Sequence, residues 1–107
     1  MKRPRPRLRP QAEQDLVAAA LNYREQGGAR LAARFFDAAL ASLDVVARMP
    51  GMGSPRLGQA CDIPELRTWV VTGFPFLWFY FDRPDGMDVL RLLGERHDIL
   101  ALLTEPQ

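Results

Sequence analysis

Residues 65–96 read ELRTWVVTGFPFLWFYFDRPDGMDVLRLLGER, and this stretch decides the fold. It holds three apolar runs of six or seven residues, at 66–71, 76–81 and 87–93. β-branched and aromatic side chains dominate these runs, and turn residues bound them, namely Gly73 and the Pro84-Asp85-Gly86 sequence. The pattern predicts an antiparallel meander of three strands.

The middle run is apolar on both faces. Alternate side chains of a strand point to opposite faces of its sheet, so one face would receive Phe76, Trp78 and Tyr80. Such a strand needs a cover on each side. We expect the helical first half of the chain to be one cover, and a C-terminal segment or a partner molecule to be the other. Because aromatic residues crowd positions 74–81, we also expect an exposed apolar groove that a partner helix or a second copy shields.

The region before the strands predicts two helices. Apolar residues recur at spacings of three and four from residue 12 to residue 23, which indicates a helix ending near residue 26. A wider apolar face predicts a second helix over residues 29–49. The short Gly27-Gly28 link implies an antiparallel helical hairpin. We expect four large residues of the second helix to lie in the core: Phe35, Phe36, Leu40 and Leu43.

The expected fold class is α+β. A helical hairpin packs on a small, mainly antiparallel sheet in the order β-α-α-β-β-β, with a short C-terminal helix at 99–103. The first strand lies within residues 5–9, and residues 50–64 form an irregular loop rich in proline and glycine. The whole chain, 1–107, is expected to be a single domain, and residues 1–6 form a basic arm.

Basic residues are unevenly placed in the chain. Five of the 14 lie at positions 2, 3, 5, 7 and 9, which leaves nine basic against 13 acidic residues and a net charge of −4 elsewhere. A basic arm on an acidic body can contact phosphate or an acidic protein segment. It can equally be a frayed terminus that keeps the protein in solution.

Composition excludes several classes of protein. The single cysteine, Cys61, excludes an internal disulfide and is expected to be inert. No apolar run approaches the ~18 residues of a membrane span, and no signal peptide is evident. We therefore expect a cytoplasmic protein that needs no metal or cofactor and does not bind membranes.

Several short phrases, taken in order, resemble the ParE/RelE superfamily of bacterial toxins, on the ParE side. The resemblance covers about residues 7–103. The phrases are PQAEQDL from Pro10, ARFF from Ala33, MPGMG from Met49, LR from Leu66, LWF from Leu77, and VLRLLG from Val89 followed by RHDI from Arg96.

This resemblance implies the toxin of a type II toxin–antitoxin system. A ParD-like antitoxin would wrap the toxin in a hetero-oligomer. ParE-like members bind DNA gyrase, whereas RelE-like members cut messenger RNA on the ribosome. A third reading is a non-toxic relative that is kept for antitoxin binding.

The residues help to choose between these readings. Cleavage at a 2′-hydroxyl needs an acid, a base and cations around the phosphate. The only lysine is Lys2, and no tyrosine lies in the C-terminal segment, so a gyrase inhibitor without catalysis is favoured. If the chain is a nuclease, its best catalytic set is Arg67, Arg91, Glu95 and His97.

Two sets of binding residues are expected. The target-binding set, with Arg91 on an open face of the sheet, is Arg67, Arg91, Arg96 and His97. The antitoxin-binding set is Trp69, Phe76, Trp78 and Tyr80. Tyr80 stands where the family commonly carries an arginine.

Overall fold

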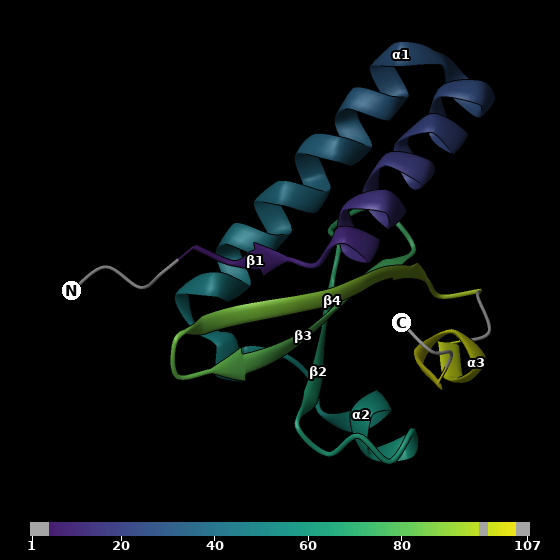
Figure 1. The fold of residues 1–107 in the computed structure, drawn as a ribbon. Helices are drawn as coiled ribbons and strands as arrows, with labels where there is room; N and C mark the ends of the chain where they lie inside the picture. Colours follow the sequence, from purple (N-terminus) through teal and green to yellow (C-terminus); the bar gives the residue numbers. More distant parts are fainter. Residues whose placement is uncertain (1–4, 97–98, 105–107) are drawn as a thin grey trace.

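The fold is that of a computed structural model, which describes residues 5–96 and 99–104. The chain folds into helices and strands in an α+β arrangement (Figure 1). In chain order the elements are β1 (Arg7–Leu8), α1 (Pro10–Arg48), the 3-10 turn η1 (Pro50–Met52), α2 (Arg56–Ala60), β2 (Leu66–Val70), β3 (Phe76–Arg83), β4 (Gly86–Gly94) and α3 (Ile99–Thr104).

Helix α1 is a helical hairpin. Gly28, at φ 90° and ψ 178°, interrupts the helical geometry and divides α1 into a first leg, residues 10–27, and a second leg, residues 29–48. Glycine tolerates this positive φ because it has no Cβ. The two legs run side by side in opposite directions (Figure 1). The predicted hairpin is confirmed.

The sheet has four strands in the order β1-β4-β3-β2. Strand β3 pairs antiparallel with both β2 and β4, which confirms the predicted meander. The short β1 pairs parallel with β4, where Arg7 lies beside Asp88. The sheet is therefore mixed but mainly antiparallel, as expected.

Strands β3 and β4 contain a β-bulge. Phe79 pairs with Arg91, but the next residue, Tyr80, pairs with Val89, so Leu90 is the extra residue. Because the bulge shifts the alternation of β4 by one position, an apolar side chain rather than Arg91 enters the core under α1.

The larger core lies between α1 and the sheet. Phe35 and Leu43 of the second leg pack there against Trp78 and Tyr80 of β3. The Trp78 indole donates a hydrogen bond to the backbone oxygen of Ala39 at 2.9 Å, which satisfies its only donor. Two residues predicted to be core are instead partly exposed on the hairpin: Phe36 at 38% and Leu40 at 37%.

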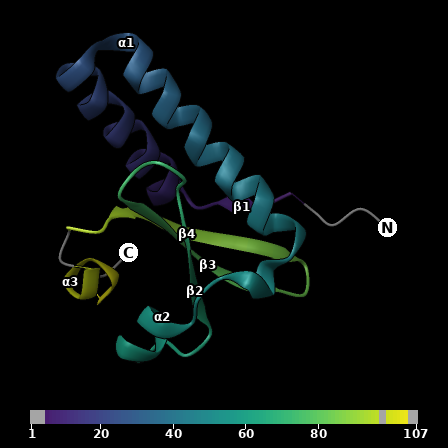
Figure 2. The ribbon, with the colours of Figure 1, turned by 180° about the vertical axis from the view of Figure 1, so that it is seen from behind.

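A smaller core covers the other face of the sheet. Leu66, Phe79, Leu90 and Leu93 form its buried centre, and side chains from α2, its flanking residues and α3 pack on them. Figure 2 shows α2 and α3 on the side of the sheet opposite the hairpin. The C-terminal segment is thus one of the expected covers. The helix α2 was not predicted, because residues 50–64 read as an irregular loop.

None of the helices among the described residues is long and apolar enough to cross a membrane.

Candidate functional site

Arg91 lies at the edge of β4 beside the first leg of α1, and not on an open face. Its guanidinium donates two hydrogen bonds to the carboxylate of Asp15, through Nε at 2.7 Å and Nη2 at 3.0 Å. The exposed fractions of the two side chains are only 8% and 11%. The expected placement of Arg91 is therefore wrong, because the Asp15 carboxylate of α1 binds its side chain at the edge of β4.

Arg67 is also bound within the chain. Its guanidinium donates hydrogen bonds to the backbone oxygens of Gly51 at 3.2 Å and Gly53 at 2.7 Å. The hydroxyl of Tyr80 holds the same loop, because it accepts a hydrogen bond from the Gly53 N–H and donates one to the Pro50 oxygen. Burial raises the pKa of Tyr80, so the hydroxyl stays protonated and able to donate.

The four residues of the expected antitoxin-binding set differ in how deeply they are buried. Trp78 and Tyr80 are both fully buried under α1, so the exposed apolar face expected at these two residues does not form. The reason is that one wide helical hairpin covers this face of β3. Trp69 and Phe76 are half-buried and pack against the same core. Contact of these two residues with an antitoxin stays a prediction.

The proposed nuclease set is not brought together among the described residues. Arg67 and Arg91 lie on strands separated by β3, and each binds a different part of the chain. Glu95 and Arg96 follow β4 and are exposed. His97 lies outside the described residues.

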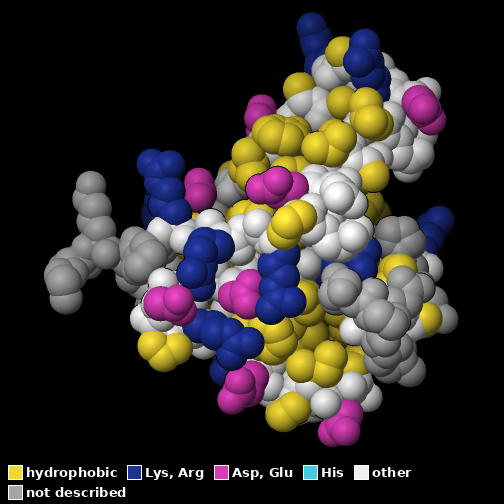
Figure 3. Space-filling view, in the orientation of Figure 1, with side chains coloured by type: hydrophobic (Ala, Val, Ile, Leu, Met, Phe, Trp, Pro, Cys, Tyr) yellow, Lys and Arg dark blue, Asp and Glu magenta, His cyan; other side chains and the backbone are white. Residues whose placement is uncertain are grey.

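Two arginines that follow the basic arm, Arg7 and Arg9, meet acidic residues near the β3–β4 turn. Arg9 donates two hydrogen bonds to Asp88, at 3.0 and 2.8 Å, and Arg7 pairs with Asp85 at 3.0 Å. The Arg9 guanidinium lowers the pKa of Asp88, and the carboxylate in turn raises the pKa of Arg9. Charged side chains of both signs gather on this part of the surface (Figure 3). The two arginines next to the arm thus have partners within the chain.

Comparison with known families decides the identity. A family profile described as the ParE toxin of the type II toxin–antitoxin system, parDE, matches residues 7–99. The chain belongs to the ParE toxin family.

The fold of this ParE-type toxin agrees with that assignment. A solved structure described as a chromosomal ParDE toxin–antitoxin system from P. aeruginosa superimposes with a TM-score of 0.70 and 18% sequence identity. The match covers 81% of this chain and 90% of that chain, and at this identity it speaks for the fold alone. A comparison with curated proteins found no match.

Asp15 is the residue of this ParE-type toxin that sequence reasoning missed. From the sequence alone, Asp15 is an acid near the start of a helix, where the helix dipole favours negative charge. A signal was present, since Asp15 directly precedes Leu16 on the apolar stripe and thus borders the buried face. Its partner was not visible, because Arg91 lies 76 residues away in sequence.

Proposed function

We propose that this ParE-type toxin stops growth by binding DNA gyrase in the cytoplasm, without breaking a covalent bond itself. A ParD-like antitoxin neutralises it. The observation that carries the proposal is that both arginines of the suggested nuclease set that lie in strands, Arg67 and Arg91, are bound within the chain. A nuclease needs cations that face the phosphate, but Arg67 holds loop carbonyls and Arg91 holds a buried carboxylate.

The exposed residues after β4 are the proposed contact with gyrase. Glu95 and Arg96 are exposed, and they follow a strand that is anchored on both sides. A rigid support lets a short polar segment bind a large partner at low entropic cost. Arg96 is therefore the target-binding residue that we would change first.

Induced expression in cells tests the kind of activity. The proposal expects growth arrest with DNA-damage signalling and with intact messages in primer extension. Arg96→Ala should weaken the arrest, whereas Arg48→Ala, which removes another exposed arginine at the end of the second leg, should not. Cleaved messages would support a ribosome-dependent nuclease instead. Unchanged growth would support a non-toxic antitoxin-binding relative.

A further inference from the structure

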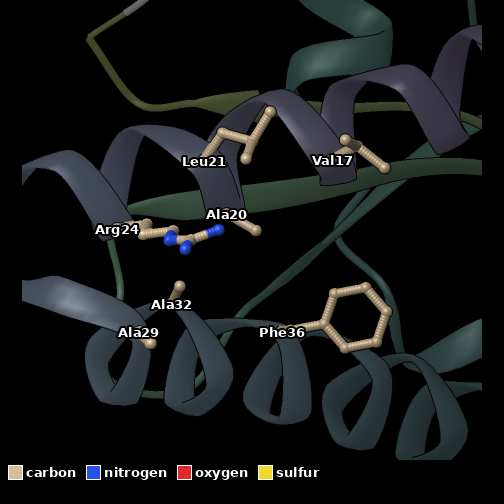
Figure 4. Close-up of a pocket in the computed structure, with 7 residues that line it drawn as sticks. All are labelled: Val17, Ala20, Leu21, Arg24, Ala29, Ala32 and Phe36. Carbon is tan, nitrogen blue, oxygen red and sulfur yellow. The ribbon is translucent and has the colours of Figure 1, made fainter.

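An apolar channel runs over the outer side of the hairpin, away from the sheet. Its first part is a pocket of about 420 Å³ between the two legs. Small and apolar side chains line it together with one arginine (Figure 4): Val17, Ala20, Leu21, Arg24, Ala29, Ala32 and Phe36. Val17 and Leu21 are 54% and 52% exposed, although both are large and apolar.

The channel continues along the first leg. A second depression, of about 460 Å³, shares Val17 and Leu21 with the first and extends to Pro10 and Glu13. Hydrophobic side chains cover much of the hairpin surface (Figure 3). At a rise of ~1.5 Å per residue, the stripe from Pro10 to Arg24 is about 21 Å long. Such an exposed stripe marks an interaction surface.

The two ends of the stripe carry opposite charges. Glu13 lies toward the start of the first leg and Arg24 toward the tip of the hairpin. Within the described residues, neither side chain forms an ion pair. Figure 4 shows the Arg24 side chain reaching along the space between the legs. The two charges are eleven positions apart, which corresponds to about 16 Å along the helix.

The walls of the channel select the kind of structure that can fill it. Both walls are helical, and the backbone N–H and C=O groups of a helix bond within the helix. A strand laid between them would leave its own backbone groups unpaired, at a cost in free energy. A helix brings its own backbone hydrogen bonds and packs its ridges into the groove between the legs.

We infer that the occupant is the first leg of a second copy of this chain. If two first legs pack antiparallel about a two-fold axis near Ala18, Glu13 of each copy lies opposite Arg24 of the other. Val17 of each then lies opposite Ala20, which pairs a large with a small residue. The stripe is thus complementary to itself in charge and in size, as a two-fold interface requires.

The dimer is a weak one. The hairpin face measures roughly 30 Å by 20 Å, from the length of the second leg and the usual spacing of packed helices. That area lies at the lower end of what specific interfaces bury on each partner, so we expect a dissociation constant in the micromolar range. The inference is independent of the gyrase proposal, since it concerns the toxin alone.

Charge reversal tests the inference. Sedimentation velocity over a range of concentrations should give a reversible monomer–dimer equilibrium for the full chain. Glu13→Arg alone and Arg24→Glu alone each bring like charges together at both ends of the interface, and should weaken the dimer by about ten-fold or more. The double variant E13R/R24E exchanges the charges and should restore dimerisation. Circular dichroism shows whether each variant folds.

Three outcomes would overturn it. The first is a wild-type chain that stays monomeric at a concentration a hundred-fold above the expected micromolar constant. The second is a dimer that neither single reversal weakens. The third is a double variant that is folded and yet dimerises as weakly as the single variants. The toxin alone could also be monomeric, with its hairpin amides protected from hydrogen exchange only when an antitoxin is present. That result would assign the channel to an antitoxin helix instead.

Discussion

At the scale of single residues, Tyr80 and Arg67 convert a loop of proline and glycine into a fixed structure. Three backbone oxygens of residues 50–53 accept hydrogen bonds from these two side chains. A side chain on Gly53 would collide with the Tyr80 hydroxyl, since an added Cβ would lie 2.1 Å from it. The packing of this loop on the middle strand β3 therefore depends on both Tyr80 and the absence of a side chain at position 53.

Replacing Tyr80 by phenylalanine should destabilise the protein by about 1–3 kcal/mol, because a buried N–H and a carbonyl oxygen lose their partner. Chemical denaturation monitored by circular dichroism measures the change. Tyr23→Phe is the matched control. This half-buried ring packs against Phe35 and Phe74, and its hydroxyl forms no hydrogen bond with another described residue. Equal stability of the two variants would contradict this role of Tyr80.

Residue by residue, sequence reasoning was better at placing side chains on faces than at finding their partners. The alternation of β3 correctly separated Trp78 from Phe79, which lie in different cores. The alternation did not predict that Trp78 would be enclosed, because the width of the covering hairpin is a tertiary property. Arg91 was misplaced for a related reason, since its partner Asp15 lies 76 residues away in sequence and no local pattern marks that contact.

At the scale of elements, Asp15 joins the first leg of α1 to the edge of β4. Strand β1 covers this edge only as far as the Arg9 N–H, which donates to the Val89 oxygen. Beyond that point, the Asp15 carboxylate accepts a hydrogen bond from the Leu92 N–H at 3.0 Å and two from Arg91. The Asp15 side chain thus supplies hydrogen bonds to the edge of β4 beyond the point where the short strand β1 ends.

Truncating Arg91 to alanine should cost about 3 kcal/mol of unfolding free energy, because it leaves the buried Asp15 carboxylate without its counter-charge. Denaturant unfolding at pH 7 gives the value. The control is Arg7→Ala, which breaks an ion pair whose side chains are 61% and 66% exposed and should change stability little. A loss for Arg91→Ala no larger than for Arg7→Ala would show that the pair is not needed.

The junction of β1 with β4 should depend on pH through Asp88. Arg9 lowers the pKa of Asp88 in the folded protein, so its stabilising effect is complete above the unfolded pKa of about 3.9 and is lost as the pH falls through the lower folded value. Because the Arg9 side chain is 40% exposed, Asp88→Asn should cost only about 1 kcal/mol at pH 7.

That cost should shrink steadily when unfolding is measured at successive pH values below about 4. A difference between wild type and Asp88→Asn that stays constant over this range would contradict the assignment.

Elements with strong local signals were predictable. The hairpin and the meander were found because their apolar spacings are regular and glycine or proline bounds them. Helix α2 was missed because it has only five residues and follows Pro55 in a region that reads as turn. Its packing depends on Gly58, where an added Cβ would lie 2.3 Å from the Leu66 oxygen, and such a contact across the fold cannot be read from local sequence.

At the scale of the whole molecule, the sheet is enclosed from both sides. The hairpin covers one face, and α2 and α3 cover the other (Figures 1 and 2). The expected exposed groove on the sheet is therefore replaced by two other surfaces, the outer side of the hairpin and the residues after β4. The proposed action by docking rests on the binding of Arg67 and Arg91 to groups within the chain.

The supercoiling activity of purified DNA gyrase tests this account most directly. Relaxed plasmid, ATP and gyrase are incubated with increasing amounts of the toxin, and the products are separated on an agarose gel. The account predicts that supercoiling falls as the toxin concentration rises, and that Arg96→Ala shifts the inhibition to higher concentration. Full supercoiling in the presence of a large molar excess of folded toxin would contradict it.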